Sequence, residues 1–213
     1  MKVVLADDHR MMREGLRALL EKAGVQVIGE AANGHEVIAE VQRLLPDIVV
    51  MDIAMPGLNG IEATRRLAVE MPAVKVVALS MNADRRYVIA MLDAGAAGYL
   101  LKNSASEELL TALQVVSQGE TYVTSAIAGS IGDRPTPGDA QRPEPARPLS
   151  PREREVLQLI AEGKSSKEIG TVLGIAVTTV ETHRRQLMAK LKLRTIAELT
   201  KYAVREGLTS VEP

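Results

Sequence analysis

Short apolar segments alternate with amphipathic segments of helix length over the first 120 residues. The apolar segments are mostly β-branched, as buried strands of a parallel sheet are, and they span residues 2–6, 25–29, 48–51, 75–79 and 98–101. The segments between them repeat their apolar residues with a helical period, at about 11–23, 34–45, 59–70, 84–94 and 106–118. This pattern predicts a doubly wound, five-stranded parallel α/β sheet with helices on both faces.

A proline-rich stretch separates this region from a second set of amphipathic segments. Residues 132–148 contain five Pro and two Gly among charged residues, a composition that predicts an extended linker without a core. Ser150, Pro151 and Glu153 then form the pattern of a capped helix start. Four helices are expected, and a short helix, a tight turn and a longer helix are typical of a helix-turn-helix; the four lie at about 151–162, 165–173, 177–192 and 195–206.

The two patterns predict three parts. We expect a flavodoxin-like α/β domain over 1–122, a short helical segment with the linker over 123–148, and an all-α four-helix domain over 149–213. Residues 1–130 carry 12 Lys and Arg against 16 Asp and Glu, whereas residues 150–213 carry 11 against 8. Because a basic surplus favours nucleic acid, only the last part is a candidate for binding it.

Composition excludes several classes of protein. The chain has no Cys, which excludes a disulfide scaffold and a Cys-ligated zinc finger. Acidic side chains appear by the seventh position, and no uncharged apolar run reaches the length of about 18 residues that a membrane helix needs. We therefore expect a soluble cytoplasmic protein without a membrane partner.

Polar side chains that can carry phosphoryl chemistry lie at the ends of four expected strands. Asp7 and Asp8 close the first strand, Asp52 the third and Ser80 the fourth, and Lys102 follows the fifth. These strand ends meet at one edge of a doubly wound sheet. Clustered carboxylates favour a hard cation such as Mg²⁺, and an Asp beside it can attack phosphorus as a nucleophile. Taken singly, each side chain is more typical of a helix cap or a solvated turn.

These residues stand in motifs that closely resemble response-regulator receiver domains. The motifs are Asp7-Asp8, VMDIAMPGLNG at 50–60, ALS at 78–80 and GYLLK at 98–102. The resemblance implies that Asp52 accepts a phosphoryl group and that Mg²⁺ is held by Asp7, Asp8, Asp52 and the backbone carbonyl of Ala54. It also implies phosphoryl contacts from Lys102 and a switch pair in which Ser80 moves toward the phosphate and Tyr99 turns inward. Asn103 stands where many receivers have Pro, which leaves the isomer of the 102–103 bond open.

Residues 149–206 resemble the LuxR-type helix-turn-helix of the NarL/FixJ class. The stretches that carry the resemblance are LSPREREVL at 149–157, GKSSKEI at 163–169, TTVETHRR at 178–185 and LKLRT at 191–195. Gly170 departs from it, because such domains commonly have Ala there, and a helical Gly costs about 1 kcal/mol.

The expected third helix of this domain has a polar face that fits the major groove of double-stranded promoter DNA. Glu181 could accept from a cytosine amine or instead pair with Arg185 four residues on, and His183 is expected to be structural. Any one basic side chain here could equally lie in solvent on the outer face of its helix and contact no DNA. The candidates for base contacts are Glu181, Thr182 and Arg185, and Thr178 is a further candidate on the DNA-binding face. The candidates for phosphate contacts are Lys164, Ser166, Lys167, Thr179, Arg184 and Lys192.

The last helix carries Ile196, Leu199 and Tyr202, which form either a dimer face or only core. Paired half-sites are the common way for so small a domain to reach specificity, and the family resemblance implies dimer contacts through this helix. It further implies a sensor histidine kinase as phosphoryl donor and a homodimer after phosphorylation. RNA polymerase is a further candidate partner.

The interpretation that follows is a phosphorylation-activated transcriptional regulator that turns over no external substrate. One alternative is an aspartyl-phosphate phosphatase, but such enzymes typically have a general-acid Asp two residues after the nucleophile, where this chain has Ala54. A second is a phosphorylation-independent DNA-binding protein whose receiver-like part only dimerises. Retention of Asp8, Asp52, Ser80 and Lys102 disfavours that alternative.

Overall fold

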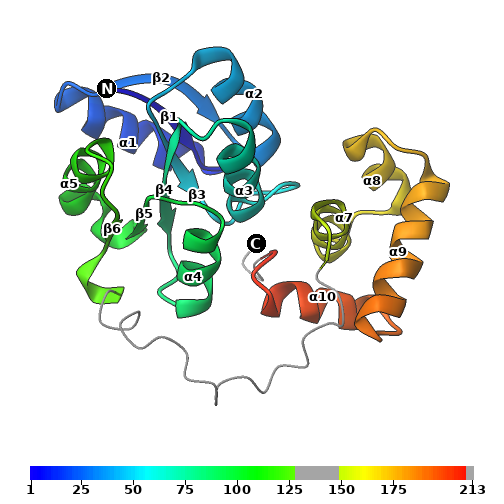
Figure 1. The fold of residues 1–213 in the computed structure, drawn as a ribbon. Coiled ribbons are helices and arrows are strands. Elements are labelled where there is room, and N and C mark those ends of the chain that lie inside the picture. The colour runs from blue at the N-terminus through cyan, green and yellow to red at the C-terminus, as the bar shows by residue number, and fades with distance from the viewer. Residues whose placement is uncertain (128–148, 210–213) are drawn as a thin grey trace. The chain divides into compact units, whose positions relative to one another are not determined.

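The computed structural model describes residues 1–127 and 149–209. The chain divides into two compact units, Met1–Asp133 and Arg134–Pro213, and each is described by itself (Figure 1). The expected linker at 132–148 lies outside the described residues. Among the helices that are described, none is long and apolar enough to cross a bilayer.

The first unit is built on a six-stranded sheet whose neighbouring strands all pair in parallel, in the order β2-β1-β3-β4-β5-β6. All five expected βα units are present. The strands are β1 (Lys2–Ala6), β2 (Gln26–Ala31), β3 (Ile48–Asp52), β4 (Lys75–Ser80), β5 (Gly98–Leu101) and β6 (Tyr122–Val123), and the helices are α1 (Arg10–Lys22), α2 (Gly34–Leu44), α3 (Gly60–Glu70), α4 (Arg85–Asp93) and α5 (Ala105–Ser117), with a 3₁₀ turn, Lys102–Ser104, before α5.

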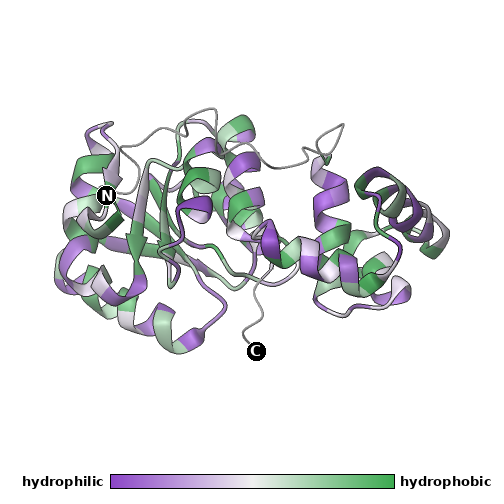
Figure 2. Cartoon of the chain, turned by 90° about the horizontal axis from the view of Figure 1, so that it is seen from below, coloured by the Kyte–Doolittle hydropathy of each residue, from purple (hydrophilic) through white to green (hydrophobic). Residues whose placement is uncertain are grey.

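Successive strand residues bury their side chains in two different cores, because side chains alternate across a sheet. Val4 and Ala6 join the core under α2, α3 and α4, whereas Val3 and Leu5 join the core under α1 and α5. Figure 1 shows these two helical layers on opposite faces of the sheet, and Figure 2 shows apolar strands between helices whose outer faces are polar. The strand ends therefore remain as the polar edge of a rigid frame.

The prediction of five strands missed β6, which adds a sixth at the edge of the sheet beside β5. Tyr122 and Thr124 anchor it: the Tyr122 Oη and the Thr124 Oγ1 both donate to Glu108 Oε2 of α5, at 3.0 and 2.6 Å. The Thr124 amide also donates to the Tyr99 carbonyl at 3.0 Å. The chain beyond α5 is thus joined to the strand that carries Tyr99.

The second unit is a four-helix domain, as expected. Three of its helices begin with a capping box, in which Ser150, Ser165 or Thr195 pairs with the Glu three residues later. One shared core, which contains Val156, Ile169, Val180, Leu187 and Leu199, holds them together; the helices are α7 (Pro151–Ala161), α8 (Ser166–Leu173), α9 (Val177–Leu191) and α10 (Ile196–Arg205).

Gly170 of α8 lies where the turn before α9 approaches most closely. A Cβ there would stand 2.8 Å from the carbonyl oxygen of Ile175, and the Ile175 amide donates to the Gly170 carbonyl at 3.0 Å. The sequence led us to expect only a cost in helix stability at this position. The structure adds a reason for the glycine, since a methyl group would push the two helices of the motif apart.

The contacts of Glu108 give a stability prediction with a defined pH dependence. The hydrogen bond from Thr124 and that from Tyr122 lower the pKa of Glu108 below its usual value of 4.5, against the opposing effect of burial. A lowered pKa stabilises the fold above the unfolded value, and this contribution is lost as the pH falls through the folded value. We expect Glu108→Gln to lower the free energy of unfolding by about 1 kcal/mol at pH 7, and by progressively less as the pH falls below 4.5 toward the folded value, in urea titrations.

Glu107→Gln is the matched control, because Glu107 is an exposed neighbour in the same turn of α5. Equal losses for the two variants, or a loss for Glu108→Gln that does not change with pH, would contradict the prediction.

Candidate functional site

The carboxyl ends of β1, β3, β4 and β5 bring four predicted side chains to one edge of the sheet. The Lys102 Nζ lies 2.7 Å from Asp7 Oδ2 and 2.9 Å from Asp52 Oδ2. Asp7, Asp52 and Ser80 are buried, with 2%, 3% and 5% of their surface exposed. Asp8 lies at the rim of this pocket with its side chain 32% exposed. Asp7, Asp52 and Lys102, which follow or close three different strands, therefore lie within contact distance of one another.

The loop after Asp52 is fixed by tight backbone packing. The Gly60 amide donates to the Ile53 carbonyl at 3.0 Å, and a Cβ on Gly60 would lie only 2.0 Å from the Asp52 carbonyl oxygen. Asn59 caps α3 by accepting from the Glu62 amide. The Ala54 amide donates to Asp52 Oδ1 at 3.3 Å, so the loop itself orients the carboxylate.

The charges in the pocket do not balance, because one ammonium serves two buried carboxylates. Burial raises the pKa of Asp52, Asp7 raises it further, and Lys102 opposes both. Burial also acts against the charge of Lys102, but Asp52 and Asp7 outweigh burial and raise the pKa of that ammonium. A surplus of negative charge remains, and a second cation would relieve it.

The donor set fits a small, hard cation. One ligand atom from each of Asp7, Asp8, His9 and Asp52 lies within 4.8 Å of the others. Three of the four are carboxylates, which are the ligands that Mg²⁺ prefers. The fourth predicted ligand, the backbone carbonyl of Ala54, is not covered by these distances, because they join side-chain atoms only.

The two predicted switch residues are connected through one loop residue, Asn82. The Asn82 amide donates to Ser80 Oγ at 3.0 Å, and its carbonyl accepts from the Tyr99 Oη at 2.8 Å. Tyr99 is fully buried, and burial raises the pKa of its phenol to about 12. The ring therefore lies inward, beneath the loop that follows Ser80.

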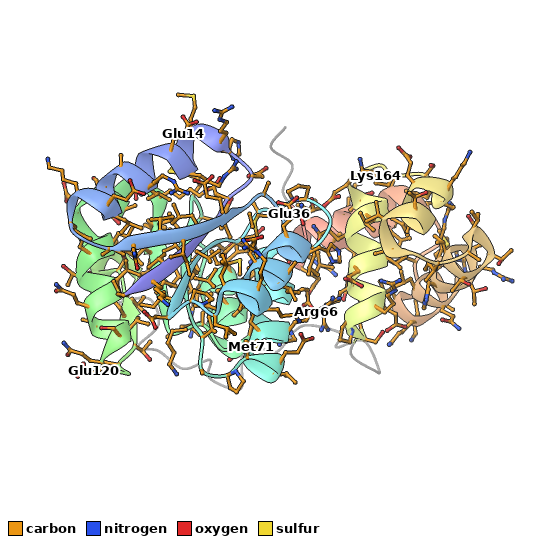
Figure 3. The ribbon with its side chains drawn as sticks, turned by 90° about the horizontal axis from the view of Figure 1, so that it is seen from above. Glu14, Glu36, Arg66, Met71, Glu120 and Lys164 are labelled. Atoms are coloured by element: carbon orange, nitrogen blue, oxygen red, sulfur yellow. The ribbon has the colours of Figure 1, made fainter. Side chains whose placement is uncertain are left out.

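Polar side chains of the second unit gather on α8, on α9 and beside them. Lys164 stands just before α8 (Figure 3), and the predicted candidates divide by exposure. Ser166, Glu181 and Arg184 are half-buried, whereas the others are exposed: Lys164, Lys167, Thr178, Thr179, Thr182, Arg185 and Lys192.

The carboxylate of Glu181 is engaged by neighbours of its own domain. Ser166 Oγ donates to Glu181 Oε1, and an Arg184 Nη lies 3.9 Å from the same oxygen. Pairing of this carboxylate with Arg185 was one of two alternatives, and the contact that the structure shows is with the backbone: the Arg185 Nε donates to the Glu181 carbonyl at 3.4 Å. His183 is half-buried and belongs to no metal-type cluster of the described residues.

The two folded parts each match a known family. Residues 3–114 match the response regulator receiver domain, and residues 147–203 match the LuxR family of bacterial regulatory proteins. The oxygen regulatory protein NreC of Staphylococcus epidermidis is 38% identical over 215 residues, which cover 98% of this chain and 99% of NreC. The transcriptional regulatory protein MctR of Rhizobium johnstonii is 39% identical over 211 residues, which cover 98% and 95%.

The chain belongs to the two-component response regulators with a LuxR-type DNA-binding domain.

Solved structures of such response regulators agree with this assignment. The RcsB response regulator of Salmonella typhimurium has a TM-score of 0.59 at 28% identity, over 96% of this chain and 98% of RcsB. An RcsB–DNA complex has a TM-score of 0.60 at 28% identity, over 95% and 96%. The family comprises transcriptional regulators rather than metabolic enzymes, so the phosphatase alternative loses its support.

Within the response regulator, one part of the expected dimer face is core. Leu199 is fully buried among the side chains of its own domain, whereas Ile196 is 43% exposed and Tyr202 is half-buried. Only Ile196 and Tyr202 remain candidates for a dimer contact. The bond between Lys102 and Asn103, which the sequence left open, is trans, as is every described peptide bond.

Two residues near the receiver pocket were missed from the sequence. The His9 Nδ1 lies 2.8 Å from Asp8 Oδ1, and an Arg13 Nη donates to the Asp7 backbone carbonyl at 2.6 Å. His9 directly follows the two aspartates, which was a usable signal. Arg13 carried no such signal, because its partner is a main-chain atom.

The shared ammonium gives a prediction about the receiver domain. Lys102→Met leaves the Asp7 and Asp52 carboxylates buried without a compensating charge, and we expect a loss of about 3 kcal/mol of unfolding free energy in EDTA. Mg²⁺ should reduce this loss, because the carboxylates without the ammonium should bind the cation more tightly, and tighter binding stabilises the folded variant more than the unmodified chain. Urea titrations with and without Mg²⁺ measure both quantities.

Lys75→Met serves as control, since Lys75 is an exposed lysine at the start of β4. A loss for Lys102→Met that Mg²⁺ leaves unchanged would show that charge compensation is not its cause.

Proposed function

We propose that a sensor histidine kinase phosphorylates Asp52 and that this modification controls dimerisation and promoter binding by the C-terminal domain. The observation that carries the proposal is the buried Asp52 carboxylate, 2.9 Å from the Lys102 ammonium at the strand ends of a receiver domain. The residues proposed to hold Mg²⁺ are Asp7, Asp8, Asp52 and the Ala54 carbonyl.

The proposed transfer uses groups that are already oriented. A carboxylate oxygen of Asp52 attacks the phosphorus of a phosphohistidine, the P–O bond forms, and the P–N bond to the departing imidazole breaks. Bound Mg²⁺ would supply positive charge for the phosphoryl oxygens. Lys102 moves its hydrogen bond from the Asp52 carboxylate to those oxygens. Hydrolysis of the acyl phosphate resets the switch, and no external substrate is turned over.

The loop at Asn82 is the proposed route from the pocket to the surface. Ser80 can donate to a phosphoryl oxygen only by turning its hydroxyl toward Asp52, and the Asn82 amide is bonded to that hydroxyl. Because the Asn82 carbonyl also holds Tyr99, movement of Ser80 shifts the loop that leads into α4. This loop is the two-state element of the proposed switch.

The proposed DNA surface is the exposed face of α9 together with the start of α8. Thr178, Thr182 and Arg185 are proposed base contacts, because they are exposed on α9 and their donors can reach base edges. A solved structure of RcsB is a complex with DNA, which supports DNA binding by this class of response regulator. Phosphate contacts are proposed for Lys164, Lys167, Thr179 and Lys192, with Ser166 and Arg184 beside them, and dimer contacts for Ile196 and Tyr202.

Intact mass spectrometry tests the phosphoryl acceptor. Incubation of the full chain with acetyl phosphate and Mg²⁺ should add the mass of one phosphoryl group, because a receiver pocket accepts it from small donors as well as from a kinase. Asp52→Asn should remove this adduct. Asp93→Asn should keep it, since Asp93 is exposed at the end of α4. No adduct on the unmodified chain, or an adduct that Asp52→Asn retains, would reject the proposal.

Substitutions on α9 test the DNA surface separately. We expect Arg185→Ala to weaken binding to a cognate duplex by about 1–3 kcal/mol and to leave binding to a scrambled duplex nearly unchanged. Lys167→Ala should weaken both equally, because phosphate contacts carry no sequence information. Fluorescence anisotropy on duplexes taken from genome-wide binding maps measures both affinities.

Lys201→Ala on α10 is the control for loss of an exposed cation outside the proposed surface. If Arg185→Ala weakened cognate and scrambled duplexes alike, Arg185 would be a phosphate contact rather than a reader of bases.

A further inference from the structure

The side chain of Arg13 reaches from the first turns of α1 to the backbone beneath the acidic pocket. One Nη donates to the Asp7 carbonyl oxygen at 2.6 Å, and the Nε donates to Glu30 Oε2 of β2 at 3.0 Å. Only 15% of the Arg13 side chain is exposed. Glu14, the next residue of α1, is labelled in Figure 3 and locates this turn of the helix.

The backbone of Asp7 is held from both sides. Its amide donates to the carbonyl of Ala31 in β2 at 3.1 Å, and its carbonyl accepts the bond from Arg13. Its carboxylate also accepts from the His9 amide at 2.9 Å, which closes the turn that contains Asp8. The positions of both carboxylates therefore depend on the peptide that Arg13 contacts.

Arg17 provides an internal comparison, because it binds the same glutamate without reaching the pocket. The Arg17 Nε donates to Glu30 Oε1 at 2.8 Å, and its Nη2 lies 2.7 Å from the same oxygen. Partial burial acts to raise the pKa of Glu30, but the bonds from Arg17 and Arg13 outweigh burial and lower that pKa. The contacts recorded for Arg17 are to Glu30, Glu21 and the Val27 carbonyl.

We propose that Arg13 is a positioning residue for the cation-binding carboxylates of the receiver, which it fixes through the Asp7 backbone. The inference rests on the proposed function, because it concerns the Mg²⁺ proposed there. Mg²⁺ demands nearly ideal octahedral geometry, so a small displacement of the Asp7–Asp8 turn lowers its affinity although every ligand is retained. Residues that orient metal ligands commonly change affinity by about 10–100-fold.

The sign of the effect separates positioning from simple electrostatics. Arg13 is a cation on the side of the pocket where a second cation is proposed to bind, so its charge alone opposes Mg²⁺. If charge were its whole role, Arg13→Gln would strengthen Mg²⁺ binding. Positioning predicts the reverse, since the freed Asp7 peptide no longer holds the two carboxylates in place.

Isothermal titration of the unphosphorylated full chain with MgCl₂ tests the inference. We expect Arg13→Gln to raise the Kd for Mg²⁺ by about tenfold. Arg17→Gln removes the same charge from the same network, and its Kd should stay close to that of the unmodified chain. Arg13→Lys keeps the charge but loses the planar fork that spans the Asp7 carbonyl and Glu30, so it should also raise the Kd.

Urea titrations of the same variants provide the second measurement. We expect Arg13→Gln and Arg17→Gln to lose similar unfolding free energy, because each breaks one ion pair with Glu30. Arg13→Lys provides the binding measurement if Arg13→Gln does not fold. Similar affinities for all four proteins, tighter binding by Arg13→Gln, or equal weakening by Arg13→Gln and Arg17→Gln would overturn the inference. An unmodified chain that binds no Mg²⁺ would instead overturn the proposed function, and this inference with it.

Discussion

One ammonium between two buried carboxylates is the contact on which the receiver domain depends. Lys102 Nζ lies within 2.9 Å of both Asp7 and Asp52, and only 7% of the Lys102 side chain is exposed. The ammonium allows the Asp7 and Asp52 carboxylates to lie close together in the fold, but the three groups together still carry one net negative charge. A pocket in this condition has affinity for further positive charge, and it responds strongly when the number of negative charges changes.

The fold determines which part of the receiver domain can respond to a change of charge in the pocket. The strands beneath the pocket are buried on both faces, so the frame itself yields little. The chain immediately beyond β4 is the element proposed to move, and Asn82 connects it to both Ser80 and Tyr99. On the side of β5 away from β4 lies β6, and the amide of Thr124, just after β6, donates to the Tyr99 carbonyl. The chain that follows α5 is therefore bonded to the backbone of the proposed switch residue.

The sequence predicted side-chain neighbours correctly where the order of strands and helices alone determined which residues lie together. Parallel strands end at a common edge, so Asp7, Asp52, Ser80 and Lys102 could be placed together before any coordinates were known. It was uninformative where a partner was a main-chain atom or an element was too short to have a period. Arg13 binds a carbonyl, and β6 has two residues, too few for alternation to appear. Leu199 has an apolar side chain that suits a core and a dimer face equally well, and only burial distinguishes the two.

Gly60, at the start of α3, restricts which substitutions the loop after β3 can accept. A single methyl group on Gly60 would overlap the peptide oxygen of Asp52, and the obstacle is backbone rather than a side chain that could rotate away. The loop that leaves β3 therefore accepts no side chain at this position, whatever its charge, size or hydrophobicity. The requirement for Asp52 in its present position is therefore also a requirement for glycine at position 60, although Gly60 takes no part in the chemistry.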